Sequence, residues 1–154
     1  MSIRNSAKAI VIDEGRILLN RCTSRFGEYY ALPGGGQNPG ETLTEAVTRE
    51  LLEETGYRIK PMRLAGIYER ISERPGDEGQ RQCHKIYFVF LCRLASVEAA
   101  APTEHDRFQI GLEWVNIKDI AGSNLFPHAI RDNIVSMLQH GETIYIGSEK
   151  EKSG

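Results

Sequence analysis

The sequence predicts one domain of the α/β (α+β) class, and three observations lead to this prediction. Apolar runs of strand length recur along the chain, and two segments between them carry apolar residues at helical spacing. The 154 residues are enough to bury one proper hydrophobic core. We expect the domain to span residues 1–146, followed by a flexible, polar tail at residues 147–154.

The strands are expected wherever apolar residues form short runs between turn signals. The first two, at residues 7–13 and 16–21, are separated by the turn-forming sequence Asp13-Glu14-Gly15. Further strands are expected at residues 64–71, 83–94, 113–115 and 143–146. Residues 86–91 are nearly continuously apolar, which is typical of a strand buried on both faces, so we expect the strand at 83–94 to be central.

The first helix has clear signals at both ends. Thr42 and Glu45 have the spacing of a capping box, in which the threonine caps the helix and the glutamate reaches back to it. Gly56 suits the left-handed backbone position that ends a helix. We therefore expect a helix between Thr42 and Gly56.

A second helix is expected after the sequence Phe126-Pro127. Its apolar residues follow helical spacing, and they are Ile130, Ile134, Val135 and Leu138. Gly141 lies past its expected end.

Three carboxylates of the first helix, Glu50, Glu53 and Glu54, stand at i, i+3 and i+4 and so share one side of it. That side overlaps the apolar arc of the helix, which consists of Leu43, Ala46, Val47 and Leu51. Buried acidic groups are costly unless they are paired or bind a metal. Clustered carboxylate oxygens suit Mg²⁺ or a similar cation. The sequence therefore predicts a metal site on the packing side of this helix.

The loop before the helix contains three consecutive glycines, Gly34, Gly35 and Gly36. Glycine reaches backbone angles closed to other residues and leaves its N–H and C=O groups open to a ligand. We expect a carbonyl of this loop, that of Gly35, to join the carboxylates as an oxygen ligand. Arg49 stands four residues before Glu53. An ion pair between them is either a surface contact worth about 0.2–0.5 kcal/mol or a support that holds a metal ligand in place.

Residues 35–57 resemble the Nudix box, the pattern Gly-x5-Glu-x7-Arg-Glu-U-x-Glu-Glu-x-Gly-U, where U is a bulky aliphatic residue. The matching residues are Gly35, Glu41, Arg49, Glu50, Leu51, Glu53, Glu54 and Gly56. Tyr57 replaces the last aliphatic residue, and we expect it to adjust the packing without loss of chemistry. The resemblance extends over most of the chain and implies a Nudix-type α/β/α sandwich with a mixed β-sheet between helices.

The resemblance implies a hydrolase that cleaves a diphosphate linking a nucleoside to another group. Its expected cofactor is Mg²⁺, with Mn²⁺ as the alternative, and Glu50, Glu53 and Glu54 would hold one to three ions. Arg49 and Glu53 belong to the expected catalytic set, in which Glu50 is either a ligand or the general base. Glu41 also matches the box, but an acid at a helix start equally serves the helix dipole.

A second source of the general base is the loop at residues 96–110. A carboxylate among cations has a lowered pKa and is a mediocre base, so the base is not restricted to the box. In several family members a glutamate of this loop contributes, and the carboxylates available here are Glu98, Glu104 and Asp106. We select Glu104 as the catalytic candidate; a solvated loop charge is the alternative for each of the three.

Four residues near the box are expected to bind the substrate, and they are Arg21, Tyr29, Gly34 and Gly36. Arg21 ends the strand before the glycine loop, where it can reach a phosphate or a ribose. Tyr29, Tyr68 and Phe126 are candidates to stack on a base, with core packing as the alternative. The substrate is left open between a nucleoside triphosphate, ADP-ribose and a nucleotide sugar. A hydrolase of a non-nucleotide diphosphate is the alternative, and a ligand-binding sensor module is less favoured because every box carboxylate is present.

The composition limits the other partners. The formal net charge of −2 gives no basic surface for a nucleic acid polymer or a membrane. The three cysteines have no metal-binding spacing, and their odd number argues against a pure disulfide framework. With no signal peptide and no apolar span of about 18 residues, we expect a cytoplasmic protein. A homodimer is an expectation from the family resemblance alone.

Overall fold

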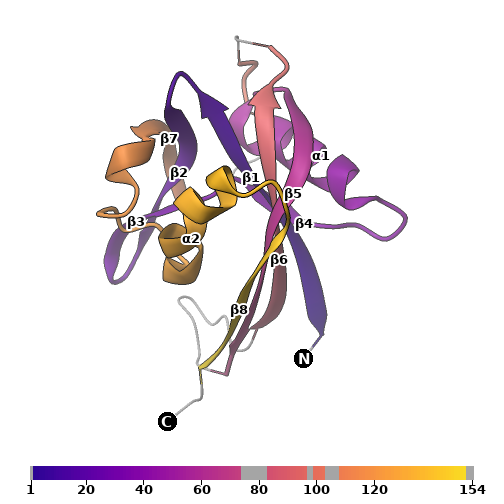
Figure 1. Cartoon of the computed structure of the whole chain (residues 1–154), viewed down its shortest axis with the longest axis vertical. Helices are drawn as coiled ribbons and strands as arrows, with labels where there is room; N and C mark the ends of the chain where they lie inside the picture. The colour runs from indigo at the N-terminus through magenta and orange to yellow at the C-terminus, as the bar shows by residue number, and fades with distance from the viewer. Residues whose placement is uncertain (1, 74–82, 97–98, 103–107, 152–154) are drawn as a thin grey trace.

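The computed structural model describes residues 2–73, 83–96, 99–102 and 108–151. Its strands are β1 (Ile3–Asp13), β2 (Arg16–Ser24), β3 (Gly27–Ala31), β4 (Gly34–Gly36), β5 (Ile59–Ser72), β6 (Cys83–Leu94), β7 (Gln109–Asn116) and β8 (Ile144–Glu151). Its helices are α1 (Leu43–Thr55), α2 (His128–Gln139) and a short 3-10 helix at Ile117–Asp119. Figure 1 shows these elements along the chain.

One mixed sheet joins all the strands. Its main order is β3-β2-β1-β6-β5-β8, with β4 paired to β1 and β7 paired to β2. The pairs β1–β6 and β5–β8 are parallel, and the other pairs are antiparallel. The predicted central position of residues 83–94 is confirmed, because β6 lies between β1 and β5.

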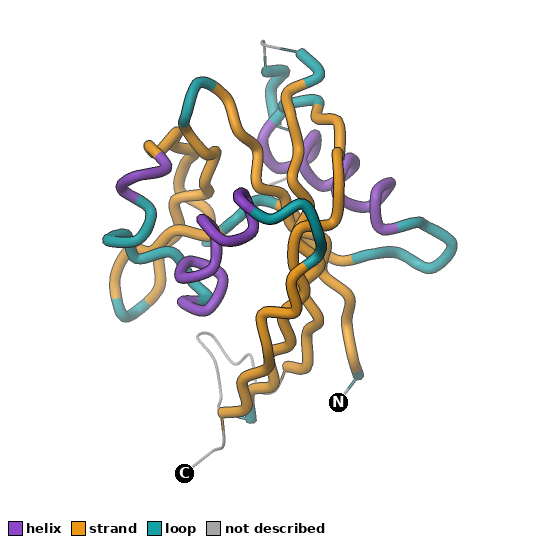
Figure 2. The backbone as a smooth tube through the Cα atoms, in the orientation of Figure 1, coloured by secondary structure: helices purple, strands orange, loops and turns teal. Residues whose placement is uncertain are grey.

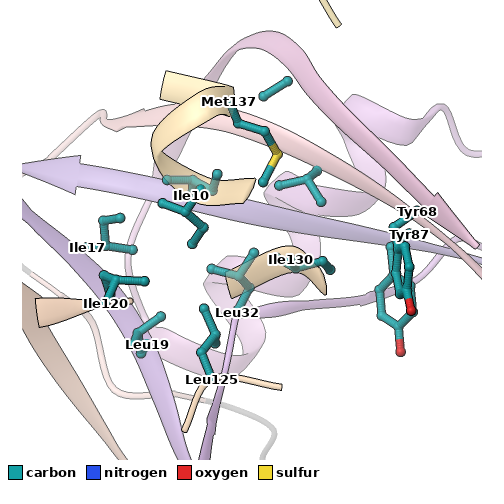
Figure 3. Close-up of a cluster of buried hydrophobic side chains, with 13 residues drawn as sticks. Ile10, Ile17, Leu19, Leu32, Tyr68, Tyr87, Ile120, Leu125, Ile130 and Met137 are labelled. Carbon is teal, nitrogen blue, oxygen red and sulfur yellow. The ribbon is translucent and has the colours of Figure 1, made fainter. Parts of the chain in front are cut away.

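The two helices cover opposite faces of the sheet, which confirms the expected α/β/α arrangement (Figure 1). Alternation along β1 explains this arrangement, since successive side chains of a strand point to opposite faces. Ala9 is buried in the cluster that contains Val47 of α1, while Ile10 is buried in the cluster that contains Ile134 of α2. Figure 3 shows the second cluster around Met137.

Helix α1 begins and ends where the sequence predicts. The Thr42 hydroxyl accepts a hydrogen bond from the Glu45 N–H, and the Glu45 carboxylate accepts one from the Thr42 N–H, each at 3.1 Å. Gly56 ends the helix with a φ of 76°. A Cβ atom on Gly56 would lie 1.7 Å from the Ala100 carbonyl oxygen, so this position requires glycine for two reasons.

The expected end of the fold at residue 146 is wrong. Strand β8 continues to Glu151 along β5, so most of the predicted tail is paired backbone. Two acidic side chains of this segment form ion pairs with Arg70 of β5. The Arg70 guanidinium lies 3.5 Å from a carboxylate oxygen of Glu149 and 3.6 Å from one of Glu151. No helix in the described part of the chain is long and apolar enough to cross a membrane.

Candidate active site

The acidic side of α1 faces the short strand β4, as its position within the apolar arc predicts. A Cβ atom on Gly35 would lie 2.6 Å from Cδ of Glu50, so the Glu50 carboxylate rests directly against the Gly35 backbone. Only glycine leaves room for this contact. The three-residue pairing of β4 with β1 at Ser6, Ala7 and Lys8 holds the glycines in place beneath the helix.

Glu54 is the most buried of the three carboxylates, with 8% of its surface exposed. One oxygen accepts a hydrogen bond from the Asn20 amide at 3.0 Å, and the other accepts one from the Gly34 N–H at 2.9 Å. Burial raises the pKa of Glu54 to about 7, and the charge of Glu50 adds to this effect. Lys8 and the two hydrogen bonds oppose it. The site therefore holds a buried acid that lacks full compensation of its negative charge.

Lys8 is a site residue that the sequence analysis missed. Its ammonium group donates a hydrogen bond to the Gly34 carbonyl at 3.3 Å, and its charge acts on Glu54. One signal was present in the sequence, because Lys8 interrupts the apolar run Ala7–Ile12. A charged residue inside a strand that is buried on both faces needs a partner.

Arg49 connects the other carboxylates. Its guanidinium donates two hydrogen bonds to Glu41, at 2.7 and 3.0 Å, one to Glu50 at 3.0 Å and one to the Gly36 carbonyl at 3.0 Å. The predicted pair with Glu53 is confirmed, at 3.1 Å. The side-chain hydrogen bond from Arg49 lowers the pKa of Glu41 to about 2, with help from the Asn38 N–H.

These contacts decide what Glu41 does in this structure. Both of its carboxylate oxygens are bonded to Arg49, and one also accepts from the Asn38 N–H. Glu41 therefore fixes the arginine that in turn holds Glu50 and Glu53.

The residues present fit a divalent cation in their chemistry. Glu50, Glu53, Glu54 and the Gly35 carbonyl offer only hard oxygen donors, which Mg²⁺ and Mn²⁺ prefer. Among the described residues, no three His, Cys, Asp or Glu side chains converge closely enough to hold an ion as they stand. One nitrogen of Arg49 bonds one oxygen of Glu50 and one oxygen of Glu53, and the second oxygen of each carboxylate makes no bond to the arginine.

Of the residues predicted to bind the substrate, Arg21 is partly exposed, while Gly34 and Gly36 form hydrogen bonds within the site. Arg21 lies on β2 with its guanidinium 3.6 Å from a Glu28 oxygen and 41% of its side chain exposed. Gly36 has its carbonyl bonded to Arg49. Gly34 is buried, its N–H donates to Glu54 and its carbonyl accepts from Lys8. Both backbone groups of Gly34 therefore help to position the site, and its contact with the substrate stays a prediction.

Aromatic side chains form a corner near α2, which we define as Tyr29, Phe126 and His128. The rings of Tyr29 and Phe126 meet edge to face at 6.4 Å, and those of Phe126 and His128 at 6.0 Å. Tyr68 is excluded from base stacking, because it is buried in the core and stacked on Tyr87 (Figure 3). The predicted base Glu104, like Glu98 and Asp106, lies outside the described residues.

Comparison with known proteins identifies the family of this chain. The NUDIX domain model matches residues 3–137. The chain is 33% identical over 112 residues to the nucleoside triphosphatase NudI of Enterobacter sp., covering 69% of this chain and 77% of that protein. It is 36% identical over 89 residues to the ADP-ribose pyrophosphatase of Methanocaldococcus jannaschii, covering 58% of this chain and 49% of that protein.

A solved structure agrees with the fold. The NUDIX hydrolase from Nitrosomonas europaea has a TM-score of 0.70 and 23% identity, with 87% of each chain covered. The chain belongs to the Nudix family and is a hydrolase of pyrophosphate bonds.

Proposed function

We propose that this protein is a metal-dependent hydrolase that cleaves a diphosphate bond in a nucleotide derivative by attack of water on phosphorus. The observation that carries the proposal is Glu54, a buried carboxylate beside Glu50 whose pKa is raised to about 7. Such a group is expensive in a site with no further role. A divalent cation bound by Glu50, Glu53, Glu54 and the Gly35 carbonyl would supply the missing positive charge, neutralise phosphate oxygens and activate water.

The protein's own residues divide the remaining work. Arg49 orients Glu50 and Glu53 through its two hydrogen bonds to them. Glu50 or Glu104 accepts the proton of the attacking water. A carboxylate beside bound cations is a weaker base, which favours Glu104 over the metal ligand Glu50 for this role. Arg21 and Gly36 lie on the strands that border the carboxylates and contact the phosphates or ribose.

The aromatic corner supports a nucleotide over a non-nucleotide diphosphate. Phe126 is 37% exposed although it meets two other rings edge to face and Arg70 lies over its ring at 4.9 Å, so the exposed part of the ring is available to a planar base. Relatives named as nucleoside triphosphatase and ADP-ribose pyrophosphatase agree with this class.

The test is phosphate and pyrophosphate release from a panel of nucleoside triphosphates, ADP-ribose and nucleotide sugars, with Mg²⁺ and with Mn²⁺. Glu53→Gln is the inactive variant. Glu45→Gln is its matched control, because Glu45 is exposed on the same helix and glutamine preserves the capping box. Turnover that requires metal and is lost only in Glu53→Gln supports the proposal. Equal turnover in both variants would overturn it.

A further inference from the structure

Asn20 is a buried polar residue on strand β2, with 4% of its surface exposed. Its neighbours on this face of the sheet are apolar: Leu18 on the same strand, and Leu112 directly opposite on β7. The Asn20 NH₂ group donates to Glu54 at 3.0 Å, but its Oδ1 is buried without a hydrogen-bond partner in the described part of the chain. An amide that leaves a buried acceptor unpaired costs stability. Core packing alone therefore does not explain an asparagine at this position.

The bond between Asn20 and Glu54 lies where two strands of the sheet diverge. Strand β6 occupies one edge of β1, so β4 and β2 both pair with the other edge, β4 with the first part of β1 and β2 with its end. Figure 2 shows the loop after β4 extending away from the sheet before α1 returns toward it. Glu54, near the end of α1, then bonds to both strands, through the Asn20 amide of β2 and the Gly34 N–H of β4. The carboxylate therefore bridges β2 and β4.

These two bonds hold the Glu54 carboxylate from both sides. Its Oε1 accepts from Asn20 at 3.0 Å, and its Oε2 accepts from the Gly34 N–H at 2.9 Å. The pairing of β4 with β1 fixes the Gly34 N–H, whereas the bond from Asn20 comes from a side chain that a substitution can remove. Arg49 donates instead to the two other carboxylates on this side of the helix. The orientation of Glu54 therefore depends on Asn20.

We infer that Asn20 is a positioning residue of the metal site, which holds the Glu54 carboxylate in the orientation that binds a divalent cation. The inference rests on the proposed function, in which Glu54 is a metal ligand. Side chains that bond to a metal ligand and fix its orientation strengthen metal binding. An amide donor is neutral, so it orients the carboxylate without cancelling the negative charge that attracts the cation. An arginine or a lysine at this position would fix Glu54 and also neutralise it.

The test measures Mn²⁺ binding by electron paramagnetic resonance, which reports the affinity without substrate or turnover. Asn20→Val removes the donor and places a β-branched apolar side chain in a buried strand, where such residues fit. Leu18→Val is the matched control, because Leu18 is buried on the same face of the same strand. We expect the Kd for Mn²⁺ to rise about tenfold in Asn20→Val and to change less than about twofold in Leu18→Val.

Asn20→Ala is a second variant that removes the same donor without adding bulk, and the Tm in EDTA shows which variants are folded. In turnover, the Mg²⁺ concentration for half-maximal rate is expected to rise about tenfold in the Asn20 variants, with kcat at saturating Mg²⁺ changed less than about threefold. A purely structural role would lower the Tm without this dependence on metal concentration.

Wild-type affinity for Mn²⁺ in a folded Asn20 variant would overturn the inference, and so would equal weakening in Leu18→Val. The proposed function fails on a different result, namely metal-dependent turnover that is retained in Glu53→Gln. The Mn²⁺ titrations involve no substrate, so they decide the role of Asn20 whichever way the turnover of Glu53→Gln falls.

Discussion

Replacing Glu54 by glutamine tests whether its buried charge destabilises the metal-free protein. The substitution removes the charge and keeps the shape of the side chain. It also preserves hydrogen bonding, because the introduced amide oxygen can accept from the Gly34 N–H. The introduced NH₂ can donate to Asn20 Oδ1, which is buried without a hydrogen-bond partner among the described residues, once the Asn20 amide has rotated. The variant therefore isolates the electrostatic cost.

The magnitude follows from the pKa of Glu54, which burial raises from 4.5 to about 7. The folded state then holds this proton more tightly than the unfolded state. The stability that the protonated carboxyl contributes is complete below pH 4.5, falls as the pH rises toward 7, and is absent above it. The difference corresponds to about 3 kcal/mol of unfolding free energy.

The assay is urea unfolding of both proteins in EDTA at pH 4.5 and at pH 8. We expect Glu54→Gln to be close to the wild type at pH 4.5 and up to about 3 kcal/mol more stable at pH 8, or roughly 6–12 °C in Tm. Adding Mg²⁺ at pH 8 should stabilise the wild type more than the variant. A stability difference that is the same at both pH values would refute the reasoning, because the cost would then not come from ionisation of Glu54.

Three further predictions concern the same helix. Glu53→Gln should lower turnover by at least about 10²-fold, as for loss of a ligand to a catalytic metal, and a large fall in the Tm of its metal-free form would contradict the assigned role. Arg49→Lys should lower both turnover and Tm, since a lysine cannot bond several carboxylates and a carbonyl at once; steady-state kinetics and calorimetry of the same preparation would show whether the two losses occur together. Gly56→Ala should cost at least about 2 kcal/mol by urea unfolding, because its Cβ would lie 1.7 Å from the Ala100 oxygen. Gly40→Ala, with a φ of 84° and open space around it, should cost about 1 kcal/mol, and an equal loss in both glycine variants would show that the contact with Ala100 is unimportant.

The parts of the fold that the sequence predicts are those encoded locally. The ends of α1 depend on Thr42, Glu45 and Gly56, which lie within one helix and its caps. Strand β4 has no strand-like pattern, since Gly34–Gly36 carry no side chains, and its pairing with β1 depends on residues far away in the chain. The extension of β8 was missed for the same reason, because its partner is the distant strand β5.

The same distinction applies to the site. Helical spacing predicted the contact between Arg49 and Glu53, which are four residues apart. Arg49 makes a stronger contact with Glu41, eight residues earlier. Glu41 lies before the helix, so helical spacing does not predict this contact. Lys8 reaches the site only because β1 pairs with β4. Long-range pairing therefore decided which side chains surround the predicted carboxylates.

The electrostatics of the helix explain why Glu54 is the carboxylate with the raised pKa. Arg49 is the arginine that contacts the carboxylates of this site. Glu41 accepts two of its hydrogen bonds, which lowers the pKa of Glu41 to about 2. The remaining bonds of Arg49 reach Glu50, Glu53 and the Gly36 carbonyl. Glu54 lies on the buried side, where it receives two neutral hydrogen bonds and the charge of Lys8, and its pKa rises to about 7. The pKa values of two acids of one site, Glu41 and Glu54, are thus shifted in opposite directions. This pattern is typical of groups with different roles. Glu41 stabilises the arginine, whereas the negative charge of Glu54 is disfavoured by burial and would be neutralised by a bound cation.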